Sequence, residues 1–234
     1  MKLYISANIY TDKQKQDAQE LTEVLKRKGH IICDLFEEAD YIVSLGGDGA
    51  LLKAAQKALA ADKPLIGINA GRKGYLCLMK QDEIEDFDEI VKRSVLTRRT
   101  TLECEFEGKK FLAVNDIVVS KVNFGETVDL HYDTLWNSCD LRGDGLIVST
   151  PTGSSAYNLA AGGPLIDYNA KVLSLTPICT HNSYPSVISD DQVVTAKVNH
   201  GQAKVYADGK DVGDTDESVI IRKADKVLKL CSKY

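Results

Sequence analysis

The short stretch GGDG at Gly46–Gly49 combines residue types that suit phosphate chemistry. It follows the apolar run DYIVSL and precedes ALLKAAQKALAA, a run of helical propensity. Glycines at a strand-to-helix junction expose backbone N–H groups beside the positive helix end, and phosphate oxygens approach them without a clashing Cβ. A carboxylate repels phosphate unless it binds a metal or accepts a proton from an attacking hydroxyl. Asp48 within this loop therefore indicates phosphoryl transfer.

The Asp48-Gly49 pair also has a simpler interpretation, as the tight turn of a β-hairpin. The helical propensity of the next segment disfavours this alternative without removing it. The loop matches neither the G-x-x-x-x-G-K-[ST] pattern of a Walker P-loop nor the G-x-G-x-x-G of a dinucleotide fold. Taken alone, the motif is weak evidence for phosphoryl transfer.

A second glycine-bearing loop, GINAGRKGYLC at Gly67–Cys77, follows another apolar run. Its glycines and Asn69 suit a close approach of the backbone to a ligand. An ordinary loop at the end of a strand explains the same residues equally well. Both interpretations therefore stay open for this segment.

The apolar stretch FLAVNDIVVS contains a polar pair, Asn115 and Asp116. Each of these groups, if buried without a partner, would cost roughly 1 to 3 kcal/mol or more. A carboxylate accepts hydrogen bonds from both ribose hydroxyls, and an Asn amide pairs with an adenine edge, so a nucleoside is one possible partner. A bulge on an exposed sheet edge is the alternative.

The most specific stretch is RGDGLIVSTPTGSSAYNLAAGGPLI, at Arg142–Ile166. An apolar strand leads into a loop rich in hydroxyl groups and then into a short helix, which is a second helix start suited to anions. A flexible Gly/Ser linker is the alternative. The apolar residues on both sides of the loop disfavour that alternative.

The elements that must position these residues divide into two halves. The first half, residues 1–97, alternates apolar runs with helical patterns and predicts an α/β domain with a parallel sheet. A helix is expected from Thr11 to Lys28, because Thr11 and Gln14 are spaced as a capping box and Gly29 is suited to end it. The expected strands are KLYISANI, HIICD, DYIVSL and PLIGIN.

The second half, residues 98–234, is β-rich and predicts a largely antiparallel domain with one interrupting helix inside TPTGSSAYNLAAGG. A turn is expected at Glu107-Gly108. The expected strands are RRTTLECEF, KKFLAVNDIVVSKV, ETVDLHYD, GLIVST, QVVTAKV, AKVYAD and VIIRK.

Composition narrows the class of protein. The 234 residues are 44% hydrophobic, and the net charge of -5 argues against nucleic acid as the main partner. The six cysteines are spread singly, which is typical of reduced thiols. The N-terminus lacks the apolar core of a signal peptide, and no apolar run approaches the roughly 20 residues that span a bilayer. We expect a cytoplasmic protein without a membrane partner.

Together, these motifs resemble those of the NAD kinase family. The similarity runs from about Asp40 to Asp211, through GGDG, NAGRKGYL, VNDIVV, DGLIVSTPTGSSAYNLAAGGPLI, LTPIC and the DG at Asp208-Gly209. The resemblance implies a Rossmann-like α/β N-terminal domain, a β-rich C-terminal domain, a site in the cleft between them, and homodimers or homotetramers. It implies transfer of a phosphoryl group from ATP, with polyphosphate as a further candidate donor, to the 2'-hydroxyl of the adenosine ribose of NAD. Mg²⁺ or another divalent cation would accompany ATP.

The resemblance also assigns roles to single residues. It implies that Gly46, Gly47 and Gly49 bind phosphate and that Asp48 is the general base for the ribose hydroxyl. No residue is assigned to a metal ion. The implied NAD-binding residues are Asp48, Gly49, Tyr75 beside the adenine, Asn115 and Asp116 at the adenosine, and Asp144, Ser155, Ala156 and Tyr157 around the remaining pocket.

The chain departs from the family pattern at several positions. Ala50 stands where the family usually has Thr, Asp116 where it usually has Glu, and Ser155 where it often has Thr. The residues Arg72 and Lys73 are also unusual for this motif. Asp116 is one methylene shorter than Glu, so its ribose contact requires a closer backbone or a bridging water. That difference concerns NAD affinity more than the type of reaction.

Two alternative functions remain. Diacylglycerol-kinase-like lipid kinases share GGDG on a similar α/β half, although TPTGSSAY favours a soluble nucleotide pocket and nothing here resembles an amphipathic membrane helix. A nucleotide-binding regulator that has lost catalysis is the second alternative, and the intact Asp48 disfavours it. Formation of NADP from NAD and ATP would separate both alternatives from an NAD kinase.

Overall fold

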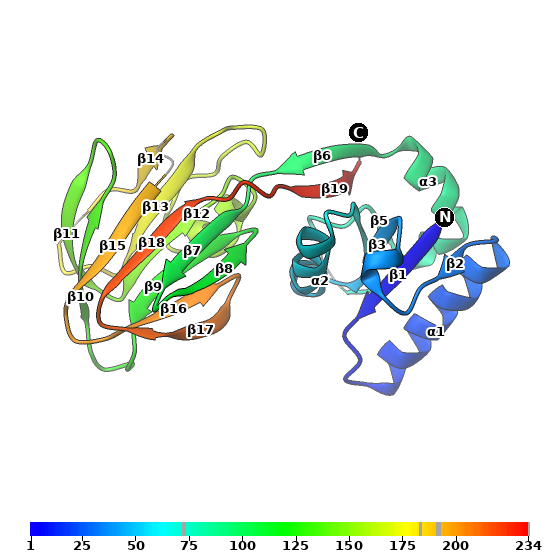
Figure 1. Cartoon of the computed structure of the whole chain (residues 1–234), viewed down its shortest axis with the longest axis horizontal. Helices are drawn as coiled ribbons and strands as arrows, with labels where there is room; N and C mark the ends of the chain where they lie inside the picture. The colour runs from blue at the N-terminus through cyan, green and yellow to red at the C-terminus, as the bar shows by residue number, and fades with distance from the viewer. Residues whose placement is uncertain (72–73, 183, 191–192, 234) are drawn as a thin grey trace. The chain divides into compact units, whose positions relative to one another are not determined.

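Residues 1–71, 74–182, 184–190 and 193–233 are described by the computed structural model (Figure 1). The chain divides into two compact units, Met1–Arg98 with Lys226–Tyr234 and Arg99–Asp225. We expected a division after residue 97, with all later residues in the second domain. Residues 226–234 instead return to the first unit.

The first unit contains a seven-stranded sheet in the order β2-β1-β3-β4-β19-β6, with β5 paired to β4 beside this path. The pairs formed by β1 with β2, β1 with β3 and β3 with β4 are all parallel, which confirms the parallel pairing expected for these strands. The strands are β1 (Lys2–Ala7), β2 (Ile31–Ile32), β3 (Tyr41–Gly46), β4 (Leu65–Asn69), β5 (Met79–Lys80), β6 (Val95–Arg99) and β19 (Leu228–Ser232).

The helices of the first unit are α1 (Asp12–Arg27), α2 (Asp48–Ala61) and α3 (Phe87–Arg93), with short 3-10 turns at Phe36–Glu38 and Gln81–Asp86. The capping box of α1 is confirmed, since the Gln14 backbone N–H donates to Thr11 Oγ1 and the Thr11 N–H donates to Gln14 Oε1. Gly29, with a φ of +84°, follows the C-terminal end of α1. Leu21, Val24 and Leu25 on α1 are buried in the core.

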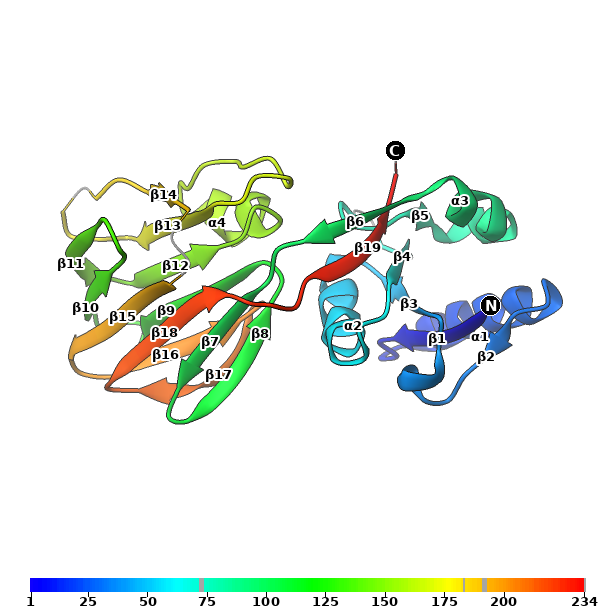
Figure 2. The ribbon, with the colours of Figure 1, turned by 45° about the horizontal axis from the view of Figure 1, so that its top comes forward.

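The last strand, β19, pairs in parallel with β4 through Leu230 and Leu65. Figure 2 shows β19 beside β6 and β4 in the first unit. The Thr97 hydroxyl donates to the Leu230 carbonyl oxygen over 3.0 Å, and Lys229 Nζ lies 2.7 Å from Asp62 Oδ2 at the end of α2. The C-terminal run VLKLCS, which we did not assign to an element, therefore completes the first sheet.

The second unit consists of two six-stranded antiparallel sheets, in the orders β11-β10-β15-β18-β7-β8 and β14-β13-β12-β9-β16-β17. The expected interrupting helix is present as a 3-10 turn at Gly153–Ser155 followed by α4 (Tyr157–Ala160). The strands are β7 (Leu102–Phe106), β8 (Lys109–Ala113), β9 (Asp116–Lys121), β10 (Val128–Asp133), β11 (Ser138–Gly143), β12 (Gly145–Ser149), β13 (Leu173–Ile178), β14 (Val187–Ser189), β15 (Val193–His200), β16 (Ala203–Ala207), β17 (Lys210–Thr215) and β18 (Ser218–Lys223).

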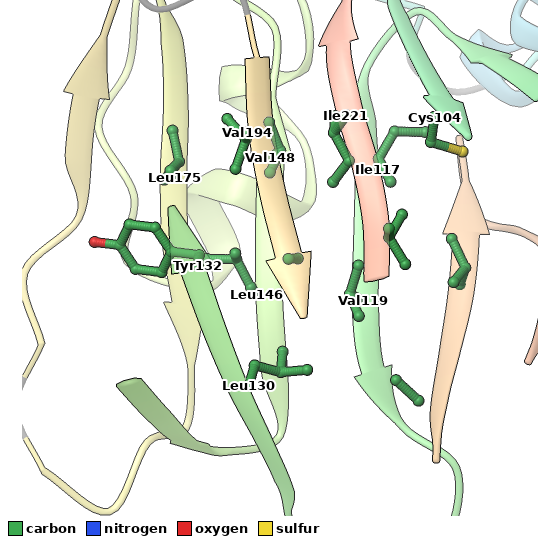
Figure 3. Close-up of a cluster of buried hydrophobic side chains, with 14 of the residues drawn as sticks. Cys104, Ile117, Val119, Leu130, Tyr132, Leu146, Val148, Leu175, Val194 and Ile221 are labelled. Carbon is green, nitrogen blue, oxygen red and sulfur yellow. The ribbon is translucent and has the colours of Figure 1, made fainter. Parts of the chain in front are cut away.

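The two sheets pack face to face around one apolar core (Figure 3). Leu130 and Ile221 enter this core from one sheet, and Val119 and Leu146 enter it from the other. Strand β12 is buried along its whole length, because Ile147 on its other face packs against Ala161 after α4. The apolar run GLIVS is continuous for this reason, and the hydroxyl-rich loop that follows it is held against a sheet.

The stretch KKFLAVNDIVVSKV forms two strands, where we expected one. Strand β8 ends at Ala113 in one sheet, and β9 begins at Asp116 in the other, so the chain crosses between sheets at Val114 and Asn115. Strand β9 is central, paired with both β12 and β16, and the edge bulge considered for Asn115 and Asp116 is not formed. The Glu107-Gly108 turn is confirmed, with φ values of 49° and 67°.

All six cysteines are free. Within the described ranges, no helix is both long and apolar enough to cross a membrane.

Candidate active site

The GGDG loop lies between β3 and α2, as the phosphate-loop hypothesis required. Strand β3 ends at Gly46, Gly47 caps the helix, and Asp48 is its first residue. Gly46 has a φ of +143°, and a Cβ added there would lie 2.6 Å from the Ala50 Cβ. The hairpin alternative is therefore wrong for Asp48-Gly49, because both residues belong to the first turn of helix α2.

The Asp48 carboxylate is held by backbone from the second glycine-bearing loop. Its Oδ2 accepts a hydrogen bond from the Tyr75 N–H and its Oδ1 accepts one from the Leu76 N–H, each over 3.0 Å. A carboxylate offers about four lone-pair sites, so each oxygen keeps further capacity to accept. The Tyr75 side chain is 80% exposed. The two loops thus meet at Asp48, while Arg72 and Lys73 lie outside the described residues.

Cys77 also lies beside this carboxylate. Burial first, and the Asp48 charge second, raise the pKa of the Cys77 thiol to about 12. The thiol is therefore protonated at neutral pH, and its Sγ lies 3.8 Å from the Gly46 carbonyl oxygen. A protonated thiol is a weak nucleophile.

A cavity of about 570 Å³ opens beside the glycines. Its lining includes Gly46, Gly47 and Gly49 together with the lysines Lys13 and Lys53. It lies where β1 and β3 end, which is the end of a parallel sheet at which α/β proteins bind ligands. Its volume falls within the range of small-molecule sites. Exposed amides, glycines and lysines give this cavity the chemistry of a phosphate site.

In the second unit, Asn115 and Asp116 are fixed by a carboxylate that we had not assigned to the site. Asp208 lies in the turn between β16 and β17, with a φ of 50°. Its carboxylate accepts hydrogen bonds from the N–H groups of Val114 at 2.9 Å, Asn115 at 2.7 Å and Asp116 at 3.4 Å. The sequence showed the Asp208-Gly209 motif, but it could not show which backbone groups Asp208 would bind.

The Asn115 backbone is held from its other side by the hydroxyl-rich loop. The Thr150 N–H donates to the Asn115 carbonyl oxygen over 2.8 Å, and the Thr150 hydroxyl donates to the Val114 carbonyl oxygen over 2.6 Å. A Cβ added to Gly153 would lie 2.1 Å from that same Asn115 oxygen. Asn115 Oδ1 is nevertheless buried without a hydrogen-bond partner in the described part of the chain. An immobile residue with an unused acceptor is suited to a ligand.

Asp116 is only 5% exposed. Burial first, and the Asp208 charge second, raise the pKa of the Asp116 carboxyl to about 7. Burial also raises the pKa of Asp208, which its three backbone hydrogen bonds oppose. Near neutral pH, Asp116 is therefore divided between its neutral and its ionised forms. A ligand that donates hydrogen bonds to Asp116 would favour the ionised form.

The remaining expected residues gather around the same place in the second unit. Asp144 forms an ion pair with Lys121, with 2.6 Å between Oδ1 and Nζ. The pKa of Tyr157 is raised by burial first and then by the charges of Cys179, Asp144 and Asp116, so its ring lies near both carboxylates. Ser155 and Ala156 are exposed and directly precede Tyr157.

The expected site residues thus form two groups, one in each unit. One group contains the GGDG loop and Tyr75, and the other contains Asn115, Asp116, Asp144, Ser155, Ala156 and Tyr157. Among the described residues, no three His, Cys, Asp or Glu side chains gather as a metal site.

Each half of the chain matches the model of a known protein family. A family model of the ATP-NAD kinase N-terminal domain matches residues 4–98, and one of the ATP-NAD kinase C-terminal domain matches residues 116–231. An NAD kinase of Sulfurimonas denitrificans is 38% identical over 211 residues, which cover 84% of this chain and 73% of the relative. An NAD kinase of Bacteroides fragilis is 31% identical over an alignment of 272 positions, gaps included, which covers 100% of this chain and 93% of the relative.

Solved structures have the same fold. The crystal structure of an NAD kinase from Archaeoglobus fulgidus in complex with ATP has a TM-score of 0.86 at 25% identity, covering 100% of this chain and 94% of that one. A yeast NADH kinase complexed with NADH also has a TM-score of 0.86, at 20% identity, covering 100% of this chain and 84% of that one. This second likeness concerns the fold alone.

Proposed function

This chain belongs to the NAD kinase family, and we propose that it transfers the γ-phosphoryl group of ATP to the 2'-hydroxyl of the adenosine ribose of NAD, giving NADP and ADP. The observation that carries the assignment to residues is the Asp48 carboxylate, which two backbone N–H groups hold at the start of a glycine-capped helix. The lipid-kinase alternative is not favoured, since the matched relatives are NAD kinases over both halves of the chain.

We assign the role of general base to Asp48. The ribose 2'-oxygen attacks the γ-phosphorus, the bond from that phosphorus to the β,γ-bridging oxygen breaks, and the hydroxyl proton passes to the carboxylate. ADP leaves with the electron pair of the broken bond. The hydrogen bonds from Tyr75 and Leu76 support this role, because they fix the carboxylate while leaving lone pairs to accept the proton.

The donor phosphates are assigned to the backbone N–H groups of Gly46, Gly47 and Gly49, at the N-terminus of α2. Mg²⁺, or another divalent cation, would be held by the phosphates of ATP, and no residue of this chain is assigned to it. When bound, the cation would neutralise charge on the transferred group.

The NAD-binding residues are proposed as Tyr75, Asn115, Asp116, Asp144, Ser155, Ala156 and Tyr157, with Asp48 and Gly49 at the reacting ribose. The unused Asn115 Oδ1 supports recognition of the adenine amino group. Asp116 supplies a buried acceptor for ribose hydroxyls, and the backbone that Asp208 fixes sets its position. The side chain of Asp116 is shorter than the Glu usual in the family, and it is carried by a backbone that Asp208 holds in place.

The direct test is NADP formation by the purified full chain with NAD, ATP and Mg²⁺, measured with an NADP-specific dehydrogenase. We expect product only when both ATP and the cation are present. Parallel reactions with polyphosphate and NADH define the donor and acceptor range, and diacylglycerol serves as the lipid acceptor. Absence of NADP under all conditions would contradict the proposal.

A homodimeric or homotetrameric assembly is proposed from the family resemblance, and a cytoplasmic location is proposed from the pattern of apolar residues in the sequence. Light scattering coupled to size-exclusion chromatography tests the assembly, and we expect a mass of two or four chains. Fractionation of the native cells tests the location, and we expect the protein among the unsedimented cytoplasmic proteins.

A further inference from the structure

Three of the residues proposed to bind NAD form a short exposed segment whose two ends are buried. Ser155, Ala156 and Tyr157 are exposed. Ser154, directly before them, is 1% exposed, and Asn158, directly after them, is 0% exposed. The segment therefore lies between two buried polar side chains, neither of which is assigned to NAD.

The Asn158 side chain makes hydrogen bonds to three different parts of the second unit. Its Nδ2 donates to the Ser154 carbonyl oxygen over 3.1 Å and to the Pro164 carbonyl oxygen over 2.9 Å. Its Oδ1 accepts a hydrogen bond from the Thr176 hydroxyl on β13 over 2.7 Å. Both N–H donors of the amide are thus used, and an apolar side chain could make none of these bonds. Asn158 therefore ties the start of the exposed segment, the chain after α4 and the sheet to one another.

Ser154 fastens the other end of the segment. Its hydroxyl donates to the Pro151 carbonyl oxygen over 2.8 Å and accepts from the Ile166 N–H over 3.0 Å. Gly163 fits closely against the Asn158 amide, since a Cβ added to it would lie 2.3 Å from Asn158 Oδ1. Hydrogen bonds and close packing therefore hold the exposed segment at both ends.

We propose that Asn158 is a positioning residue for NAD, which acts by holding Ser155, Ala156 and Tyr157 in their binding arrangement. This inference rests on the proposed function and adds a residue outside the set assigned to NAD. Because Asn158 is wholly buried, it acts through the backbone and through Thr176 rather than by touching the dinucleotide. A segment that is already held at both ends loses less conformational entropy when a ligand binds, so the anchor contributes to NAD affinity.

Calorimetry on the purified full chain tests this role, with NAD and inorganic tripolyphosphate as separate probes. Asn158→Asp keeps the size of the side chain but places an oxygen where Nδ2 donates to two carbonyl oxygens. We expect it to raise the Kd of NAD about tenfold or more. The Kd of tripolyphosphate, a probe of the glycine loop in the first unit, should stay within about twofold of wild type. Unfolded molecules lower the number of binding sites rather than the affinity, so calorimetry separates the two effects.

Thr176 offers a milder, matched pair of variants, which serves if Asn158→Asp does not fold. Thr176→Val removes the hydroxyl that donates to Asn158 Oδ1 while keeping the shape of the side chain, and it should raise the Kd of NAD about three- to tenfold. Thr176→Ser keeps the hydroxyl and should stay within about twofold of wild type.

Leu130→Ala is the control for a general loss of stability in the second unit. Leu130 lies in the core between the two sheets, so its truncation destabilises the unit and leaves the hydrogen bonds of Asn158 in place (Figure 3). We expect it to leave the Kd of NAD within about twofold of wild type. Unchanged NAD affinity in both Asn158→Asp and Thr176→Val would overturn the proposal. An equal loss of NAD affinity in Leu130→Ala and Asn158→Asp would overturn it as well, because the role of Asn158 would then be structural only.

The NADP assay separates this inference from the proposed function. If the chain forms no NADP but Asn158→Asp and Thr176→Val selectively weaken NAD binding, the positioning role stands and the proposed reaction fails. If NADP forms and both variants bind NAD as the wild type does, the reaction stands and the positioning role fails. A wild-type chain that binds no NAD would overturn both.

Discussion

The two units use carboxylates in opposite ways. In the first unit, Asp48 is anchored by the backbone of Tyr75 and Leu76, so a neighbouring loop positions the side chain proposed to react. In the second unit, Asp208 anchors the backbone of Val114 to Asp116, so that the side chains of Asn115 and Asp116 remain available. Mutations should therefore affect turnover most in the first unit and stability and NAD affinity most in the second.

The largest expected effect tests the first half of this comparison. Asp48→Asn should lower kcat by about 10²- to 10⁴-fold, because an amide cannot take the hydroxyl proton. Only one of its side-chain atoms accepts hydrogen bonds, so one of the two loop N–H groups loses its partner. We expect KM for NAD to change less than kcat, measured by steady-state kinetics. Asp62→Asn, at the end of the same helix, is the control, and a kcat within tenfold of wild type would refute the base role.

Gly153→Ala tests how firmly the second unit holds Asn115. The added Cβ would lie 2.1 Å from the Asn115 carbonyl oxygen, so the backbone of one loop must shift. We expect a loss of about 1 to 3 kcal/mol in the free energy of unfolding and a raised KM for NAD. Urea denaturation and kinetics measure the two effects. The exposed Gly201, where an added Cβ meets nothing but φ is +81°, is a comparison for backbone strain without the clash.

Asp208→Asn tests whether the carboxylate of Asp208 serves to hold the backbone, in contrast to Asp48, which the backbone holds. The substitution weakens acceptance from three backbone N–H groups and should reduce the free energy of unfolding by about 1 to 3 kcal/mol. It should raise KM for NAD with little change in kcat, because the side chains of Asn115 and Asp116 would be displaced while their functional groups stay the same. Equal falls in kcat and in NAD affinity would show that Asp208 belongs to the reacting group instead.

The last prediction is a pH dependence of stability that belongs to the second unit. The pKa of Asp116 is about 7 in the folded protein against 3.8 for an ordinary Asp, so the folded state binds more protons between these values. Its contribution to stability is therefore fully present below about pH 3.8 and is lost as pH rises toward 7. Urea denaturation from pH 5 to 8 should show the wild type losing stability relative to Asp116→Asn. The exposed Asp216→Asn is the control, and parallel curves for wild type and Asp116→Asn would exclude the effect.

Local signals in the sequence were sufficient for several elements. The capping box at Thr11 and Gln14 fixes the start of α1 through hydrogen bonds between residues three apart, which neighbouring residues alone determine. The GGDG loop was likewise recognisable, because the helical propensity after it decided between a hairpin and a helix start. The β-rich second half followed from the alternation of its apolar residues.

Contacts between distant residues could not be predicted in this way. Strand β19 joins the first sheet beside β4, and the run LKLCS carries no information about its partner. FLAVNDIVVS reads as one apolar strand because both β8 and β9 face a core, yet the two strands belong to different sheets. The hydrogen bonds of Asp208 join residues more than ninety positions apart.

The sequence by itself determined the parallel α/β half, the β-rich half and the chemistry of the glycine loop, because these depend on the spacing of nearby residues. Only the tertiary structure decided which backbone groups hold Asp48, and that burial and then the charge of Asp208 raise the pKa of Asp116. Burial, charge coupling and hydrogen bonds to distant backbone arise when the chain is folded, and their energies depend on distances that a linear sequence does not contain.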